Sequence, residues 1–168
     1  MMALARFIFL LCSLALAGAG AANASGEEKP RDIIYQPSPP APASQSRDEA
    51  AAKSAGCQSC HASTDAASMH SSPGVILGCV DCHGGNAEVR KPEGAGKGDT
   101  AYFAAQEKAH VLPTLPGSWH YPSSANPKSS FTLLNREAPE YVRFVNPSDY
   151  RAADLACGNC HADIILRA

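Results

Sequence analysis

Cys57-Gln58-Ser59-Cys60-His61 is a five-residue pattern that returns twice in this chain, as Cys79-Val80-Asp81-Cys82-His83 and as Cys157-Gly158-Asn159-Cys160-His161. On a helical turn, positions i, i+3 and i+4 lie on one face. Each copy therefore presents two thiols and one imidazole on the same side. Cys-x-x-Cys-His is the attachment signature of c-type haem, in which both thiols bond the porphyrin edge and the imidazole binds the iron.

The same cysteine spacing also occurs in zinc sites and in redox dithiols. Neither of those sites requires a histidine directly after the second cysteine, whereas here a histidine follows in all three copies. The sequence therefore predicts three covalently attached haem c groups, each with a proximal iron ligand from its own motif. The attachment residues would be Cys57, Cys60, Cys79, Cys82, Cys157 and Cys160, and the proximal ligands His61, His83 and His161.

The chain has six histidines, and the three outside the motifs match the number of distal iron positions. His70, His110 and His120 are therefore the candidate distal ligands, although a histidine in such a position can also lie on the surface or bind a haem propionate. His70 is nine residues from both the first and the second motif, which puts haem one or haem two within its reach. Met69 is an alternative axial ligand, and it would raise the reduction potential relative to His.

Residues 1–24 have the pattern of a secretory signal peptide. Arg6 precedes an apolar stretch at residues 7–17, and Ala22-Asn23-Ala24 offers a cleavage site. An uncleaved membrane anchor is the alternative. Cleavage would remove Cys12 and leave six cysteines in three pairs. Bacteria attach c-type haem outside the cytoplasmic membrane, so signal and motifs agree, and we expect a periplasmic or extracellular protein.

Apolar side chains are scarce in the part of the chain that contains the first two motifs, which bears on the fold class. Residues 47–110 contain six Leu, Ile, Val or Phe residues among 64. That is too few for a conventional core, whereas a buried macrocycle supplies apolar area that can replace many side chains. We therefore expect a haem-cored, mainly α protein with extensive irregular loops and little or no β-sheet, whose apoprotein is largely unfolded.

Local sequence signals predict a linker, a domain boundary, a helix start and a loop between the signal peptide and residue 98. Residues 25–46 are polar and then Pro-rich, which predicts a flexible linker, and residues 47–168 would form a triheme cytochrome c domain. Ser46 and Glu49 have the spacing of a capping box, so a helix should begin here and lead into the first motif. Residues 84–98 are rich in Gly and charge, which predicts a loop.

Three further elements are expected downstream. Asp99 is a plausible N-cap for a helix over residues 100–111, and Pro-rich residues 112–135 should be irregular. Residues 141–145 are strand-like and predict a short strand. Asn146 followed by Pro147 predicts the start of a helix that runs to about Ala156 and leads into the third motif.

Several other side chains are candidates to contact haem. Four arginines can bind propionates through forked hydrogen bonds or simply lie on the surface: Arg90, Arg136, Arg143 and Arg151. Three aromatic residues either pack on porphyrin faces or belong to an ordinary core: Trp119, Tyr121 and Phe144.

Residues 55–163 resemble the multihaem c-type cytochromes of bacterial respiration. Besides the motifs, the resemblance rests on Met69-His70-Ser71, on the Gly78-Cys79-Val80-Asp81-Cys82-His83-Gly84-Gly85 block and on the Arg143-Phe144-Val145-Asn146-Pro147-Ser148-Asp149-Tyr150-Arg151 block, which look like the start of larger multihaem proteins. It implies electron transfer outside the cytoplasm through closely stacked haems, often with two histidines on each iron. The small number of motifs departs from the larger family members, which suggests a small triheme protein or a fragment of a longer chain.

These observations predict an exported triheme cytochrome that relays single electrons between respiratory redox partners, which would be other redox proteins or cytochromes. Two histidines on each iron leave no open position, which favours electron transfer over catalysis. The spacer of 17 residues between the first two motifs should place haems one and two side by side, and the third haem, after 73 residues, is expected at one end.

Two alternatives remain open. A subunit of a nitrite or hydroxylamine reductase would need an open iron; the absence of a Cys-x-x-Cys-Lys variant disfavours it, and a non-ligating His120 would favour it. A subunit of a cytochrome filament or conduit would self-assemble or join a membrane-associated respiratory complex. The net charge of −2, without a basic patch, argues against a nucleic-acid partner.

Overall fold

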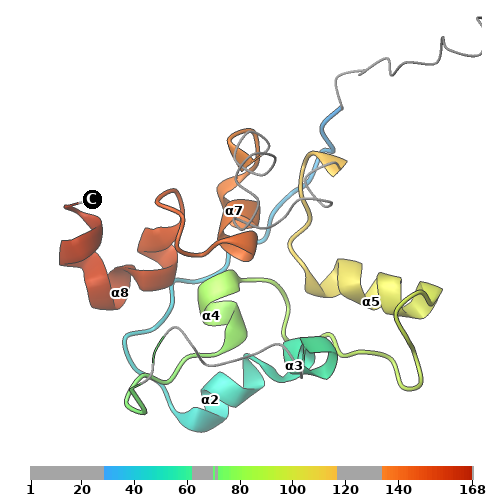
Figure 1. Cartoon of the computed structure of the whole chain (residues 1–168), viewed down its shortest axis with the longest axis horizontal. Coiled ribbons are helices and arrows are strands. Elements are labelled where there is room, and N and C mark those ends of the chain that lie inside the picture. Colours follow the sequence, from blue (N-terminus) through green and yellow to red (C-terminus); the bar gives the residue numbers. More distant parts are fainter. Residues whose placement is uncertain (1–28, 62–69, 71, 117–133, 168) are drawn as a thin grey trace, which may run out of the picture.

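The computed structural model describes residues 29–61, 70, 72–116 and 134–167. The described residues form helices joined by irregular segments and contain no strand, so the predicted mainly α class is confirmed (Figure 1). The helices are α2 (Arg47–Ala52), α3 (Ala55–His61), α4 (Cys79–His83), α5 (Thr100–Ala109), α7 (Pro139–Val145) and α8 (Ala153–Ile165). Within those described ranges, no helix is both long and apolar enough to cross a membrane. The predicted signal peptide, Met69 and His120 lie outside the described residues.

The predicted capping box at Ser46 is confirmed. The Ser46 hydroxyl accepts a hydrogen bond from the Glu49 amide at 3.2 Å, and the Glu49 carboxylate accepts one from the Ser46 amide at 2.8 Å. The helical stretch that follows is divided, because α2 ends at Ala52 and α3 begins at Ala55. At the break, the Ser54 hydroxyl accepts a hydrogen bond from the Cys79 amide at 3.0 Å and so ties this corner to the start of α4.

Helix α4 lies at the centre of the fold, where it contacts both α7 and α8 (Figure 1). The predicted strand at residues 141–145 is wrong, since these residues belong to α7. Their β-branched and aromatic side chains favour a strand by propensity, which is a context-dependent preference. Pro139 starts a helix there instead, and the helix buries Tyr141 and Val142 in a core cluster with Leu134 and Ala152. Burial of these two side chains in the core outweighs local propensity.

The helix before the third motif begins later than the sequence predicts. Asn146 is the C-cap of α7, and residues 147–152 form turns before α8 begins at Ala153. The Asp149 carboxylate holds this turn because it accepts hydrogen bonds from both the backbone amide and the guanidinium of Arg151. Helix α5 agrees better with prediction: Asp99 is its N-cap, and the helix ends at Ala109, two residues early.

Residues 29–46, here called the N-terminal strap, differ from the flexible linker that the sequence predicted. The strap is extended but packs along the helices instead of projecting from them (Figure 1). The Tyr35 hydroxyl donates to the Leu112 carbonyl at 2.7 Å, and the buried Ala41 exchanges hydrogen bonds with Leu155 and Asn159 of α8. Proline removes amide donors, but the remaining backbone groups of the strap still find partners in the helical domain.

The loop over residues 84–98, predicted from composition, is confirmed and lies against α3. The Gly56 amide donates to the Ala87 carbonyl at 2.8 Å, and a Cβ at Gly56 would clash with the carbonyls of Ala87 and Val89. Glycine is therefore required at this position because the loop backbone touches the helix directly. The contact brings the loop that follows the second motif onto the helix that carries the first.

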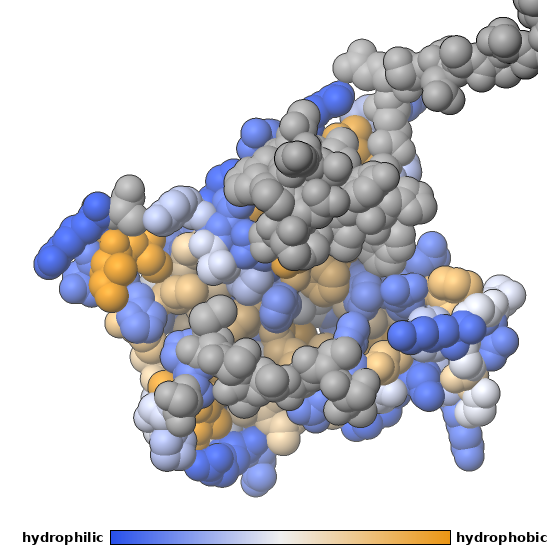
Figure 2. All heavy atoms as spheres, viewed as in Figure 1, coloured by the Kyte–Doolittle hydropathy of each residue, from blue (hydrophilic) through white to orange (hydrophobic). Residues whose placement is uncertain are grey.

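The apolar core formed by the described residues is small. One buried cluster is centred on Tyr141 and Val142, while other large apolar side chains remain on the surface, including Ile164 and Leu166 of α8, which are 60% and 86% exposed. Figure 2 shows apolar surface at this end of α8. The described residues therefore bury few apolar side chains, as the composition predicts.

Candidate functional site

Each of the three motifs lies on a helix, as the spacing predicts. The first occupies the second half of α3, the second is the whole of α4, and the third lies in α8. Helices α3 and α4 end at their motif histidines, His61 and His83. Helix α8 continues, but its backbone leaves helical geometry at His161, with φ −123° and ψ 27°. The helix of the second motif thus ends directly after its histidine, with Gly84 as the C-cap, and the helix of the third motif is kinked at its histidine.

The six motif cysteines are not joined by disulfides in the part of the chain that the structure describes. Burial, together with the nearby Cys157 thiol, raises the pKa of the Cys82 thiol, and burial and Cys160 raise that of Cys157. A redox dithiol instead needs a thiol whose pKa is lowered, because the thiolate is the nucleophile. The electrostatics at Cys82 and Cys157 therefore do not match a dithiol site. They also indicate that the second and third motifs are close neighbours.

Two histidine pairs form between distant parts of the chain. The ring centroids of His61 and His110 are 6.1 Å apart with an interplanar angle of 29°. Those of His70 and His161 are 6.3 Å apart at 16°. Each pair combines one motif histidine with one histidine from outside the motifs. The sequence had placed His70 within reach of haem one or haem two, whereas the fold brings it to the third motif.

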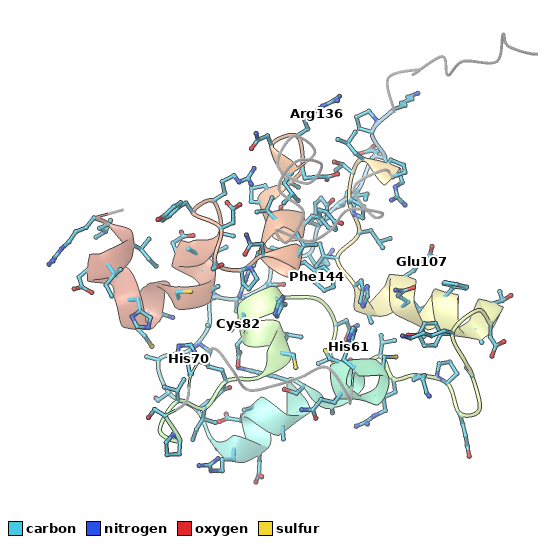
Figure 3. All side chains as sticks on the ribbon, in the orientation of Figure 1. His61, His70, Cys82, Glu107, Arg136 and Phe144 are labelled. Atoms are coloured by element: carbon cyan, nitrogen blue, oxygen red, sulfur yellow. The ribbon has the colours of Figure 1, made fainter. Side chains whose placement is uncertain are left out.

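These two pairs lie on either side of the second motif. In Figure 3, Cys82 of α4 lies between His70 on the α8 side and His61 on the α3 side. The order of the motifs in space is thus first, second, third, with α4 in contact with α8 and tied to the α2–α3 corner through Ser54. The neighbouring positions of the first two motifs and the outer position of the third agree with the spacer lengths.

His83 has its orientation set by the backbone of α7. Its Nδ1 lies 2.7 Å from the Phe144 carbonyl oxygen. A carbonyl only accepts hydrogen bonds, so Nδ1 must carry the proton and donate, which leaves the Nε2 lone pair available. A histidine that binds metal usually donates its other ring N–H in this way, and the bond fixes both tautomer and ring direction.

His110 is held in an apolar environment. Its ring lies 4.9 Å from that of Phe144, centroid to centroid, at an angle of 48°. Burial, with a smaller contribution from the charge of His61, lowers the pKa of His110 to about 4. His110 is therefore neutral at pH 7. The neutral imidazole is the form that binds a metal ion.

A buried carboxylate ties the second motif to the end of α2 and to the strap. Asp81 of α4 accepts hydrogen bonds from the Lys53 ammonium at 2.8 Å, from the Gln45 side-chain amide and from the Gly78 backbone amide. Burial alone would raise the pKa of Asp81, but these donors outweigh it and lower the pKa. This contact is not predictable from the sequence, since the second variable position of the motif gives no signal beyond the presence of an acid.

Arg143 is the second organising residue, in a role that differs from the propionate contact considered from the sequence. Its side chain is 2% exposed and donates to four backbone carbonyls: Ser38 and Pro39 of the strap, and Asp81 and Cys82 of α4. The guanidinium therefore clamps the strap onto the second motif and does not face outward to a propionate. Arg151 is likewise engaged, by an ion pair with Asp149 at 2.7 Å.

The donor sets can be compared with those of metal sites. Within the described ranges, no group of three or more His, Cys, Asp or Glu side chains is placed to hold a metal ion, as a zinc site requires. A haem iron takes four ligands from the porphyrin and at most two from the protein. Two histidines facing each other, beside a pair of cysteines, are the donor set that haem c accepts, so the residues present fit this group.

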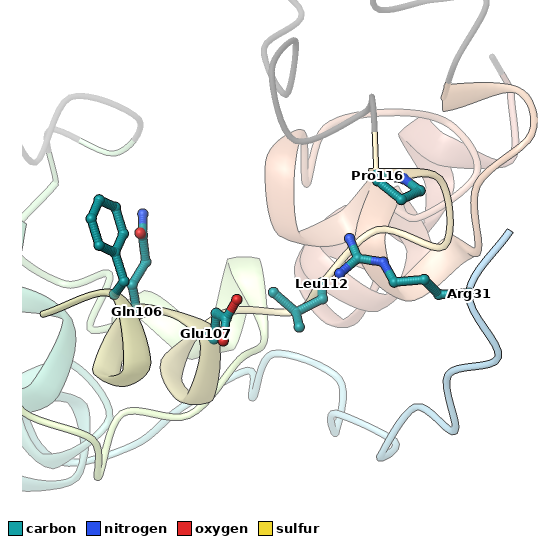
Figure 4. A pocket seen from close by; sticks show the side chains of 6 residues that line it. Arg31, Gln106, Glu107, Leu112 and Pro116 are labelled. Atoms are coloured by element: carbon teal, nitrogen blue, oxygen red, sulfur yellow. The ribbon is translucent and has the colours of Figure 1, made fainter. Parts of the chain in front are cut away.

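A pocket of about 230 Å³ lies elsewhere, between α5 and the strap (Figure 4). Its lining consists of Arg31, Phe103, Gln106, Glu107, Leu112 and Pro116. None of these is a histidine or cysteine, and the pocket is separate from both histidine pairs. Comparisons of the chain with family models, with curated proteins and with solved structures yield no match.

Proposed function

We propose that this protein is an exported triheme c-type cytochrome that passes single electrons between respiratory redox partners outside the cytoplasm. The observation that carries the proposal is the pair of mixed histidine contacts, His61 with His110 and His70 with His161. Each contact joins the histidine of a Cys-x-x-Cys-His motif to one of the three histidines outside the motifs. Neither contact pairs two motif histidines or two outside ones.

The ring spacing supports iron ligation by both members of each pair. With a metal–nitrogen bond of about 2 Å and a ring centroid roughly 1 Å beyond each nitrogen, two imidazoles on opposite sides of one metal have centroids about 6 Å apart. The observed separations are 6.1 Å and 6.3 Å. Ordinary aromatic pairs span about 4.5–7 Å, so the identity of the partners, rather than the distance alone, favours ligation.

The assignments follow from the pairs. His61 and His110 would bind the first iron, and His161 and His70 the third. His83 would bind the second with its free Nε2, and His120 is then the remaining candidate for the opposite side. When bound, each haem supplies an iron that alternates between the ferric and ferrous states.

The remaining residues would serve to hold these ligands in place. Two histidines per iron exclude substrate and keep the coordination unchanged between oxidation states, which suits electron transfer rather than a reductase reaction. The contact of α4 with α8 and the hydrogen bond from Cys79 to Ser54 hold the three attachment helices next to one another. Such proximity is what transfer from one iron to the next requires.

The proposal is tested on the full chain, produced in a bacterial host that carries out haem c maturation. We expect three covalent haems per chain by haemochrome assay, low-spin ferric spectra and no carbon monoxide binding after reduction. Substitutions His70→Ala and His110→Ala should each open one haem to carbon monoxide, and the double variant should open two. Wild-type protein without covalent haem would refute the proposal, and carbon monoxide binding by the wild type would favour the reductase subunit instead.

A further inference from the structure

We propose that Phe144 positions axial ligands of two different haems, His110 on the first through its ring and His83 on the second through its backbone carbonyl. This inference rests on the proposed function. The Phe144 ring contacts the ring of His110 at 4.9 Å between centroids. The Phe144 carbonyl accepts a hydrogen bond from Nδ1 of His83 at 2.7 Å. In Figure 3 it lies at the end of α7 that faces α4 and the end of α3.

The carbonyl is available because of where α7 ends. The last four carbonyls of a helix have no partner within the helix, and Phe144 is the residue before the last in Pro139–Val145. One of these carbonyls is satisfied by a side chain, the imidazole of His83. A longer helix would have engaged the carbonyl with its own backbone, so the short length of α7 is what frees the acceptor.

The ring is placed by its neighbours. Arg143, the preceding residue, donates to the carbonyls of Asp81 and Cys82 and so attaches this end of α7 to the second motif. Gly85 follows the second motif with φ +81°, and a Cβ there would lie 2.7 Å from the Ala109 carbonyl and 3.3 Å from the Phe144 ring. Glycine at residue 85 therefore lets the end of α5, the second motif and the ring meet.

The Phe144 ring, tilted by 48° to the His110 ring at 4.9 Å between centroids, restricts rotation of that imidazole about its side-chain bonds. His110 directly follows α5 and has no cysteine pair beside it, whereas a motif histidine would also be held by the covalent bonds of its two cysteines. Removal of the ring should therefore let His110 turn or dissociate, while His61 remains held by its own motif. A contact that merely fills space would affect stability without changing the ligand.

The test uses Phe144→Leu, which keeps apolar volume but removes the flat ring, and Phe144→Tyr, which keeps the ring. Phe103→Leu is the matched control, since this phenylalanine is 51% exposed on α5 and its ring contacts Tyr102. In reduced holoprotein, Phe144→Leu should let one of the three haems bind carbon monoxide and should change one low-spin ferric signal. Phe144→Tyr and Phe103→Leu should behave as the wild type.

Wild-type behaviour of Phe144→Leu in both measurements would overturn the inference. If that variant yields no holoprotein, the wild type decides by NMR: the Nδ1 proton of His83 must exchange slowly, and the Phe144 ring must carry paramagnetic shifts. Absence of either signature overturns it as well. A wild type without covalent haem would refute the proposed function itself, whereas a wild type with six-coordinate haems and an unaffected Phe144→Leu variant would refute this inference alone.

Discussion

Substitution of Arg143 is expected to destabilise the folded protein more than substitution of Arg151 or Arg167. The side chain is 2% exposed, and its four hydrogen bonds all go to backbone carbonyls, two on the strap and two on α4. Arg143→Met keeps most of the aliphatic length but removes every donor. Four carbonyls then lose their donor, one from a buried and three from part-buried hydrogen bonds, and the strap loses its attachment to the second motif.

The magnitude follows from the burial and the charge of the donor. Hydrogen bonds that involve a charged group contribute about 1.5–3 kcal/mol each, but bonds made by one group do not add. An acceptor left without its donor costs about 1–3 kcal/mol, and because these costs do not add in full we expect a total loss of about 3–5 kcal/mol. With a urea dependence of about 2 kcal/mol per molar, the unfolding midpoint should fall by about 1.5–2.5 M. Arg143→Lys should lie between, because an ammonium cannot reach both strap and helix.

The assay is urea unfolding of the holoprotein followed by far-UV circular dichroism. Arg167→Met is the matched control, because this arginine is 82% exposed and its ion pair with Asp163 spans 3.9 Å. Such a pair contributes about 0.5 kcal/mol or less, so the control midpoint should barely move. Equal midpoints for Arg143→Met and Arg167→Met would refute the role of Arg143 as a clamp.

Three other changes have defined outcomes. Gly56→Ala should lower the free energy of unfolding by about 3 kcal/mol in urea, because the new Cβ meets loop backbone. Gly158→Ala is the control: its Cβ would have its nearest neighbour at 3.8 Å, so this variant should be neutral or up to about 1 kcal/mol more stable. Equal effects of the two substitutions would contradict the contact between Gly56 and the loop. Ser46→Ala should cost about 1 kcal/mol and fray the start of α2, seen as faster amide exchange there. Hydrogen bonds from Arg151 lower the pKa of Asp149 from 3.8, so their contribution is present above pH 3.8 and is lost as pH falls through the lowered pKa. Arg151 also donates to the Leu134 carbonyl and the Asn135 side chain, so Arg151→Met should lose a part that is independent of pH and, from the pair, about 1 kcal/mol or less at pH 7 in thermal unfolding. The part due to the pair should shrink below pH 3.8; a deficit wholly independent of pH would argue against the pair.

Sequence reasoning was most successful where the signal is local. The motif spacing predicted that each motif lies on a helical turn, and the motifs do lie in α3, α4 and α8. The capping box at Ser46 was equally local and equally correct. The strand expected at residues 141–145 failed because side-chain propensity competes there with burial of Tyr141 and Val142, and burial depends on residues that are distant in sequence.

The candidate ligands themselves could be chosen from the sequence because three motifs left three histidines over. Their partners could not. His70 is nine residues from two motifs and yet lies against His161, 91 positions along the chain, since the loop geometry and the packing of α8 on α4 determine which rings meet. Chain distance limits which contacts are possible, but it does not rank them once loops are long enough to reach several sites.

The amino-acid sequence by itself determined the helical turns of the three motifs, the residue types offered to a haem and the helical class of the fold, because each depends on contacts between residues a few positions apart. The tertiary structure alone decided the histidine pairs, the burial of Arg143 beneath the strap and the two contacts of Phe144. These depend on backbone carbonyls and ring faces that meet only after α4, α7 and α8 have packed together. Every residue has a backbone carbonyl, so the sequence does not indicate which one a given side chain will contact.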